Sequence, residues 1–338
     1  MDIIERLYQS YYNNKVPLIV VFELTKRCVN RCIHCYLPET HQKKLYEKEL
    51  SFNEIKRALD EMRELGVIFL NLTGGEPVLR DDIEKIIKKA VSNNFYVKLF
   101  TSLNFDHRIF ERLYDIGLRE IDVSLYGKRD THNFVCRSDC FDRVIENIKR
   151  LKEKGYKINI KTPLMNLNLD DIEWVYKFSK KYKCGFFIDP VITPLNDGDG
   201  LTLKYLVDFN LAFNKINKFM KFSKSRYKSS QDNYRYFCGA LRTIIGIDCY
   251  GKVFPCLAFP FEVGDIKEKS LKEIFYSNYS EALRKIIEEE PLRCRLCRYK
   301  DFCSRCVGLS WVYKKDFEYT YKQFCKIAKI FCLVFDNS

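Results

Sequence analysis

Apolar extended segments alternate with amphipathic helical segments along more than half of the chain. Extended segments are expected at residues 18–24, 67–73, 96–101, 119–125, 157–162 and 186–192. Helices are expected between them, at residues 51–65, 81–94, 107–116, 141–154 and 170–182. Strands that alternate with helices form βαβ units around a parallel sheet. About six units fit here, fewer than the eight of a closed barrel. The pattern therefore predicts an α/β fold with a partial (β/α)6 barrel of the TIM type.

The remainder of the chain follows a different pattern. The turn-rich sequence from Asn196 to Gly200 ends the alternation. A helix is expected from Leu201 to Phe222, and a β-hairpin from Arg242 to Cys256 with its turn at Gly251. We predict four parts, namely an N-terminal segment at 1–15, the barrel at 16–195, a linker with a helix at 196–237, and a small Cys-rich domain of a hairpin and helices at 238–338.

Composition and charge narrow the class of protein. No apolar stretch reaches the ~18 residues that a membrane span needs, and residues 1–12 lack a secretory signal core, so we expect a cytoplasmic protein without a membrane partner. The net charge of +13 would suit an acidic partner such as nucleic acid. Because the basic residues are spread along the chain, we favour a solvated surface instead. Fifteen cysteines in a reducing compartment indicate metal or catalytic roles rather than disulfides.

Three cysteines with Cys-x3-Cys-x2-Cys spacing follow the first expected strand; they are Cys28, Cys32 and Cys35. Iron–sulfur clusters normally take four Cys ligands, so a loop with three leaves one iron open to a small molecule. A zinc site with His34 or His41 as fourth ligand is the alternative. Buried structural cysteines are a further alternative, but charged neighbours argue against a place in the core.

A glycine-rich turn follows the second expected strand and consists of Gly74, Gly75, Glu76 and Pro77. Glycines let a backbone approach a ligand closely or adopt positive φ, and the Glu76 carboxylate suits an ammonium group. Alone, the segment reads as an ordinary βα turn. One βα unit after a three-Cys loop, it indicates a cofactor site.

The two motifs together resemble the radical S-adenosylmethionine (radical SAM) superfamily, over about residues 16 to 193. The resemblance implies that the three cysteines hold a [4Fe–4S] cluster whose open iron binds S-adenosylmethionine. One electron, from a flavodoxin or ferredoxin, then cleaves this cofactor to methionine and a 5′-deoxyadenosyl radical that abstracts hydrogen from a substrate. The protein supplies orientation and excludes water.

The resemblance also implies roles for further residues. The segment Gly74 to Pro77 would meet the methionine amino group, and Tyr36 would lie near adenine. Ser124 would lie near the ribose and the carboxylate. Arg137 would pair with the carboxylate, and a solvated surface arginine is the alternative reading. No catalytic acid or base is assigned.

A second set of cysteines lies near the C-terminus and consists of Cys238, Cys256, Cys294, Cys297, Cys303, Cys306 and Cys325. Zinc-ribbon knuckles lie ~15–20 residues apart, whereas five residues separate the two Cys-x2-Cys pairs here. The set resembles the SPASM domain, which implies one or two auxiliary iron–sulfur clusters. One would take Cys238, Cys256 and Cys306, and the other Cys294, Cys297, Cys303 and Cys325.

Two details depart from the SPASM pattern. The spacing between Cys303 and Cys306 is x2 where the family usually has x3. The first auxiliary cluster has three assigned ligands, so Cys249 completes it or the fourth position stays open, which we favour. Of the remaining cysteines, we expect Cys136 and Cys140 in the βα loop after the fourth strand, either buried or redox-active near the substrate.

Segments 187–194 and 302–308 resemble the peptide-modifying maturases among SPASM enzymes. The implied substrate is a ribosomal precursor peptide, and the implied reaction is a crosslink, thioether, epimerisation or excision. Since about 17 residues precede the first strand, leader binding would need a separate protein or direct docking. Alternatives are a tetrapyrrole enzyme of haem synthesis, a sulfatase-maturase-like enzyme, which Leu257 disfavours because that group carries Asp there, and a non-enzymatic metal-binding regulator.

Overall fold

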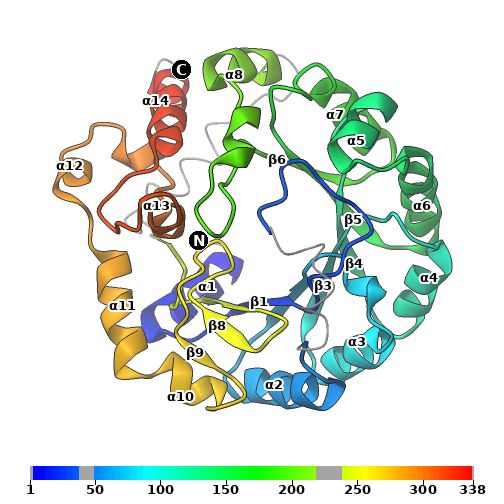
Figure 1. Ribbon diagram of the computed structural model, residues 1–338, viewed down its shortest axis with the longest axis horizontal. Coiled ribbons are helices and arrows are strands. Elements are labelled where there is room, and N and C mark those ends of the chain that lie inside the picture. Colours follow the sequence, from blue (N-terminus) through cyan, green and yellow to red (C-terminus); the bar gives the residue numbers. More distant parts are fainter. Residues whose placement is uncertain (1–2, 38–48, 218–237, 337–338) are drawn as a thin grey trace.

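A nine-stranded sheet organises the computed structural model, which describes residues 3–37, 49–217 and 238–336 (Figure 1). The strands are β1 Ile19–Glu23, β2 Phe69–Thr73, β3 Tyr96–Thr101, β4 Glu120–Ser124, β5 Lys157–Pro163, β6 Gly185–Asp189, β7 Ile244–Ile247, β8 Lys252–Phe254 and β9 Gly264–Asp265. Their order is β6-β5-β4-β3-β2-β1-β7-β8-β9. The strands from β6 to β7 pair in parallel, and β8 and β9 add antiparallel pairs.

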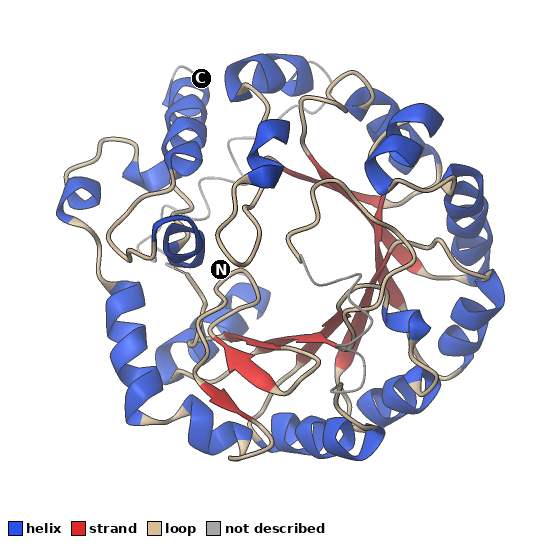
Figure 2. Ribbon diagram, viewed as in Figure 1, coloured by secondary structure: helices blue, strands red, loops and turns tan. Residues whose placement is uncertain are grey.

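The sheet is an open arc with helices on its outer side and loops toward the centre (Figure 2). The α-helices of the barrel are α2 Phe52–Glu64, α3 Ile83–Ser92, α4 His107–Asp115, α5 Arg129–Cys136, α6 Phe141–Lys154 and α7 Ile172–Lys181. The other α-helices are α1 Ile3–Asn14, α8 Phe209–Asn217, α10 Leu271–Phe275, α11 Asn278–Glu288, α12 Leu292–Arg295, α13 Val307–Lys314 and α14 Lys322–Asp336. Short 3-10 helices are η2 Pro77–Leu79, η3 Leu201–Tyr205 and η4 Lys300–Phe302.

The partial α/β barrel predicted from the sequence is confirmed, and its helix signals act as expected. Ser51 and Glu54 form a capping box at the start of α2, and Gly155 ends α6 at φ 110°. The outer face of the sheet carries the core, in which Phe22 and Leu72 are fully buried against Leu59 and other helix side chains. Because helix and strand side chains share this core, the packed helices hold the strands in place and position the loops at their carboxyl ends.

The inner face of the sheet is polar at its centre. Glu120 and Asp122 on β4 are buried, and Lys98 and Lys161 from the neighbouring strands pair with them. Asn159 donates to both carboxylates at 2.7 Å. Buried charges need such partners, so the barrel interior is a compensated ionic network.

The structure differs from the prediction in several places. The hairpin is continuous with the barrel, because β7 pairs in parallel with β1 and matches Ile19 to Ile244. The N-terminal segment contains α1, which donates the Tyr11 hydroxyl to Gly66 O at 3.0 Å. The expected helix at 201–222 divides into η3 and α8, and its last residues lie outside the described part. The sixth strand ends at Asp189, where Pro190 cannot donate to the ladder.

No helix among the described residues combines the length and apolarity that a membrane span requires.

Candidate active site

The three cysteines of the first motif lie on the loop after β1, and all three are half-buried. Among the described residues, they do not form a group with sulfurs within 4.8 Å of one another. Three thiolates on one zinc ion at about 2.3 Å would be closer than that, so the donor set fits a larger cluster better than zinc. Burial raises the pKa of the Cys28 thiol to about 12. Iron binding must therefore displace a proton there.

His34, one of the two histidines offered as zinc ligands, does not form a ligand group with the three cysteines. The His34 ring lies edge-on to the Tyr126 ring, with centroids 4.9 Å apart. Burial lowers its pKa to about 4, so the ring stays neutral. His41 lies outside the described residues. His34 therefore packs from the cluster loop against the Tyr126 ring.

The two glycines of the second motif let the end of β2 lie against the cluster loop. Gly75 N donates to Thr25 O at 2.7 Å, and Glu76 N donates to Arg27 O at 2.6 Å. A Cβ on Gly74 would lie 2.3 Å from Thr25 O, and one on Gly75 would lie 2.1 Å from Arg27 O. Gly74 also has φ +140°. No other residue fits these positions without moving the cysteine loop.

Glu76 links the carboxyl ends of β2 and β3. Its buried carboxylate accepts from Thr101 Oγ1 at 2.8 Å, from Ser102 N at 2.8 Å and from Ser102 Oγ at 2.6 Å. Burial raises its pKa, and the Ser102 and Thr101 donors act against that rise. Pro77 is buried at the start of η2. The role of Glu76 toward an amino group stays a prediction, and its role as a strand link is visible.

The other predicted cofactor residues are Tyr36, Ser124 and Arg137, and they lie on three different segments. The Tyr36 hydroxyl is 3.5 Å from Glu23 Oε1. Burial raises the pKa of Tyr36, and the negative charges of Glu23, Cys35 and Cys256 raise it further. Ser124 is the last residue of β4. Arg137 is exposed and caps α5 at φ 51°. Tyr36 therefore lies beside Glu23 and Ser124 lies at the carboxyl end of the sheet, whereas Arg137 follows α5 with an exposed side chain.

A pocket of about 330 Å³ lies between the cluster loop, the segment after β6 and the C-terminal hairpin. Its lining is Glu23, Lys26, Leu37, Asn196, Asp197, Asp248, Tyr250, Phe254, Leu257 and Pro260. Three carboxylates face one lysine in this set, although the whole chain is basic. The pocket therefore favours a neutral or basic group over an anion.

Buried charges line one wall of this pocket. Lys26 Nζ lies 2.5 Å from Glu23 Oε2, and both side chains are buried. Burial lowers the pKa of Lys26, but Glu23 outweighs it, so the net shift is upward. Burial raises the pKa of Asp248 to about 6, against donation from the backbone of Lys252 and the charge of Lys26. Sequence reasoning missed these three residues; the available signal was a charged residue at the carboxyl end of an apolar strand.

The C-terminal cysteines fall into two groups in space. Burial raises the pKa of Cys256, and the charges of the Cys238 and Cys306 thiols raise it further. This electrostatic effect requires the three thiols to lie near one another. Burial raises the pKa of Cys303 to about 11, and the charges of Cys325, Cys294 and Cys297 add to it. These are the groups that the SPASM resemblance implies, while iron ligation by each thiol stays a prediction.

Cys249 lies apart from the first of these groups. Burial raises its pKa, and its charged neighbours are Lys26, Asp248, Glu49 and Glu23 rather than the cluster thiols. Cys249 O also accepts from Leu50 N at 2.7 Å. This position agrees with a first auxiliary cluster that Cys249 does not complete.

Arg305 connects the two auxiliary groups and was not predicted. Its guanidinium donates to Glu289 O at 3.2 Å and to Phe317 O at 2.5 Å. Burial raises the pKa of Cys306 and of Cys238, and the positive charge of Arg305 acts against this rise at both thiols. A cation beside both groups would stabilise thiolates and clusters of negative charge.

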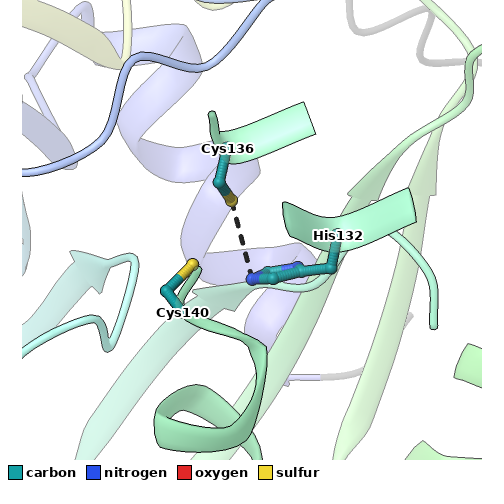
Figure 3. Close-up of side chains that lie close together, drawn as sticks. All are labelled: His132, Cys136 and Cys140. Carbon is teal, nitrogen blue, oxygen red and sulfur yellow. Dashed lines mark hydrogen bonds between the residues drawn. The ribbon is translucent and has the colours of Figure 1, made fainter. Parts of the chain in front are cut away.

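Cys136 and Cys140 lie in the connection after β4, as we expected, but this connection contains the helix α5. Cys136 ends α5, and Cys140 precedes α6 as its N-cap. With His132 they form the only set of described residues whose metal-ligand atoms all lie within 4.8 Å of one another (Figure 3). Hydrogen bonds from Cys136 and then His132 lower the pKa of Cys140 to about 5, with burial opposing. The short turn between two helices, rather than any motif, brings these side chains together.

Sequence comparison identifies two domains. Residues 22–179 match the family model of the Radical SAM superfamily, and residues 238–306 match that of SPASM, an iron-sulfur cluster-binding domain. The AdoMet-dependent heme synthase of Methanosarcina barkeri is 25% identical over 332 residues, which cover 89% of this chain and 94% of that protein. A GTP 3′,8-cyclase of Nautilia profundicola is 28% identical over 315 residues, covering 83% and 92% of the two chains.

Solved structures show the same fold at low sequence identity. Streptococcus suis SuiB bound to its precursor peptide SuiA has a TM-score of 0.71 and 17% identity, covering 93% of this chain and 78% of that one. The anSMEcpe protein with bound AdoMet and Cp18Cys peptide has a TM-score of 0.70 and 17% identity, covering 95% of this chain and 100% of that one. The likeness establishes the fold alone.

Proposed function

Because this chain is an enzyme of the radical SAM superfamily with a SPASM domain, we propose that it modifies a peptide by removing a hydrogen atom from one of its residues. Its cofactors are S-adenosylmethionine, a [4Fe–4S] cluster and auxiliary iron–sulfur clusters. The proposed substrate site is the pocket at the barrel mouth, because the lining comes from the radical SAM cluster loop and from the SPASM hairpin together. A substrate there would lie between the two redox-active regions.

The charge of this pocket is the observation that favours a peptide substrate. Glu23, Asp197 and Asp248 face Lys26 alone, and Glu23 already holds Lys26 in a buried ion pair. A nucleoside triphosphate or a tetrapyrrole with several carboxylates would meet net negative charge there, which costs binding energy. An uncharged or basic residue of a peptide would not.

The structural relatives add support of a weaker kind. SuiB and anSMEcpe share the fold and hold peptides in their solved structures. Pockets that take peptides combine apolar contacts with a few polar groups that fix orientation. Leu37, Phe254 and Leu257 supply apolar contacts here, and Tyr250 supplies a hydroxyl.

In this proposal, bound cluster and cofactor supply the radical that removes the hydrogen atom. The residues of the chain orient and shield. Gly74 and Gly75 keep the end of β2 against the cysteine loop, and Tyr36 closes the site on the side of Glu23. Leu37 and Leu257 exclude water from the reacting carbon. Asp248, with its pKa near 6, can accept a hydrogen bond or a proton from the substrate.

The test is anaerobic co-expression with short peptides encoded beside the gene, followed by mass spectrometry of each peptide. A crosslink removes two hydrogens, and the change should vanish when Cys28, Cys32 and Cys35 are all replaced by Ala. The variant Cys184→Ala is the matched control, because Cys184 is buried away from both motifs, where Tyr182 O accepts from its thiol. A modification that survives the triple replacement would refute the proposal.

A tetrapyrrole substrate is the second candidate. It rests on the similarity to the heme synthase of Methanosarcina barkeri, which extends over 94% of that protein. Formation of 5′-deoxyadenosine that depends on an added tetrapyrrole, and not on any peptide, would favour this candidate. An electron donor of the flavodoxin or ferredoxin type and a separate leader-binding protein belong to the peptide proposal and would be sought among proteins that co-purify.

A further inference from the structure

Two cysteines and a histidine form a buried cluster that neither the radical SAM site nor the SPASM groups use. His132, Cys136 and Cys140 are each 1% exposed. Cys136 Sγ lies 3.5 Å from His132 Nε2, and the Cys140 sulfur points toward the same ring atom (Figure 3). His132 and Cys136 stand four residues apart on one face of α5. A buried group with this chemistry needs an explanation.

The hydrogen bond on the other ring nitrogen argues against a metal ion here. Tyr126 N donates to His132 Nδ1 at 3.3 Å, so Nδ1 is the acceptor and Nε2 carries the proton of the neutral ring. A metal-bound histidine shows the reverse, since its second nitrogen donates outward. The Nε2 proton therefore points at sulfur, as in a thiol–imidazole pair, and the two sulfurs remain a dithiol.

The dithiol is connected to the cluster loop by backbone hydrogen bonds. Arg31 N donates to Cys136 O, and Ile33 N donates to Val135 O, each at 3.0 Å. These bonds lie on either side of Cys32, a proposed cluster ligand. The Tyr126 ring extends the connection, because it stacks on His132 at 5.5 Å and its hydroxyl lies 3.9 Å from Cys32 Sγ. A movement of Cys136 would therefore shift the loop that holds the cluster.

We propose that Cys136 and Cys140 are a redox site, which closes to a disulfide on oxidation and thereby loosens the cluster loop. The two sulfurs lie within 4.8 Å of each other, and a disulfide brings them to about 2.05 Å. Closing that gap draws Cys136 away from His132 and pulls on the last turn of α5. The chain then holds its cluster loop in place only while the dithiol is reduced.

The chemistry balances with a hydroperoxide as oxidant and a small dithiol as reductant. One thiolate attacks the peroxide to give a sulfenic acid, and the second sulfur displaces water from it. In sum, two thiols and one hydrogen peroxide give one disulfide and two waters. Reduction proceeds by thiol–disulfide exchange with the added dithiol through a mixed disulfide.

The position of Arg137 makes the test direct. Trypsin cleaves after Arg129, Arg137 and Arg143, so Cys136 and Cys140 fall in separate peptides, 130–137 and 138–143. The full-length, cluster-loaded protein is treated anaerobically with limiting hydrogen peroxide, alkylated and digested. We expect the two peptides to appear joined by a disulfide, and to separate again after incubation with dithiothreitol.

Matched variants separate a specific site from general oxidation. Cys140→Ser should abolish the joined peptide and make iron retention insensitive to the same peroxide dose, whereas Cys184→Ser should leave both unchanged. Three results would overturn the inference: both cysteines recovered as alkylated thiols, Cys136 joined instead to Cys32, or one zinc per chain that His132→Ala removes. None of these readouts depends on which substrate the enzyme takes.

Discussion

Gly75 has no room for a side chain at the cofactor edge. Its missing side chain leaves room for the backbone of Lys26 and Arg27, whose oxygens would lie 2.7 and 2.1 Å from a Cβ. We expect Gly75→Ala to destabilise the fold by about 1–3 kcal/mol through overpacking and to reduce iron uptake at the first cluster. Iron analysis and urea unfolding measure both effects.

Gly200→Ala is the matched control for that substitution. A Cβ on Gly200 would meet only the side chain of Leu203, at 3.3 Å, and its φ of −83° is ordinary. An equal loss of iron in both variants would contradict a specific role for Gly75 in holding the cysteine loop.

Asp248 gives a pH signature. Burial raises its pKa from 3.8 to about 6, so the folded chain holds this proton more tightly than the unfolded chain does. The free energy of unfolding therefore falls by up to about 3 kcal/mol as pH rises from about 4 to about 6. Above about pH 6, Asp248 causes no further change in the free energy of unfolding. Asp248→Asn should remove this fall while keeping an acceptor for Tyr250 N. Urea unfolding of both proteins at several pH values tests it, and parallel curves would contradict it.

Arg305 has a measurable electrostatic role. Its charge lies beside the thiols of both auxiliary groups. Arg305→Gln should make the auxiliary clusters harder to reduce, because a more negative surrounding lowers their potential, and should leave the first cluster unchanged. A redox titration followed by electron paramagnetic resonance measures this. A shift of all clusters together would indicate a general structural change.

At the level of elements, α14 depends on contacts with the segment after β6. The Tyr321 hydroxyl donates to Ile192 O at 3.2 Å, and Gln323 Nε2 donates to Pro190 O at 2.6 Å. α14 also carries Cys325. Tyr321→Phe combined with Gln323→Ala should cost about 1–3 kcal/mol and lower the iron content of the second auxiliary group. Tyr276→Phe, at a half-exposed hydroxyl, should change neither in the same iron assay and unfolding experiment.

The elements also show where local sequence suffices. The strands and helices of the barrel were predictable because capping residues and apolar periodicity are local signals, as at Ser51 and Gly155. The pairing of β7 with β1 joins residues more than two hundred positions apart, and no local pattern specifies such a partner. α5 was missed because a polar segment of eight residues lacks a clear apolar stripe.

The residues of the candidate site also divide into those that local sequence indicates and those that only the folded chain brings together. The cysteines and Gly74 to Pro77 were identified from spacing and resemblance. Glu23, Lys26 and Asp248 were not, because only the folded chain brings the end of β1 beside the hairpin. Glu76 acquires its strand-linking role only through Thr101, the last residue of β3, and Ser102, which follows it. Motifs therefore indicated the cofactor, and long-range packing created the pocket that we propose for the substrate.

At the scale of the whole molecule, the first cysteine motif and the C-terminal cysteines should hold separate clusters. Fully loaded protein should contain about 12 irons if three four-iron clusters form. Replacing Cys28, Cys32 and Cys35 by Ala should remove about a third of them and abolish cleavage of S-adenosylmethionine, while the auxiliary iron remains. Equal loss of all iron would contradict independent sites.

Hydrogen abstraction from a peptide is tested most sharply by following the abstracted hydrogen with an isotope label. A peptide that this enzyme modifies is prepared fully deuterated at carbon, and the 5′-deoxyadenosine formed with it is analysed by mass spectrometry. We expect one deuterium from the peptide to appear in this product. Unlabelled 5′-deoxyadenosine with every such peptide, together with deuterium transfer from a labelled tetrapyrrole, would contradict it.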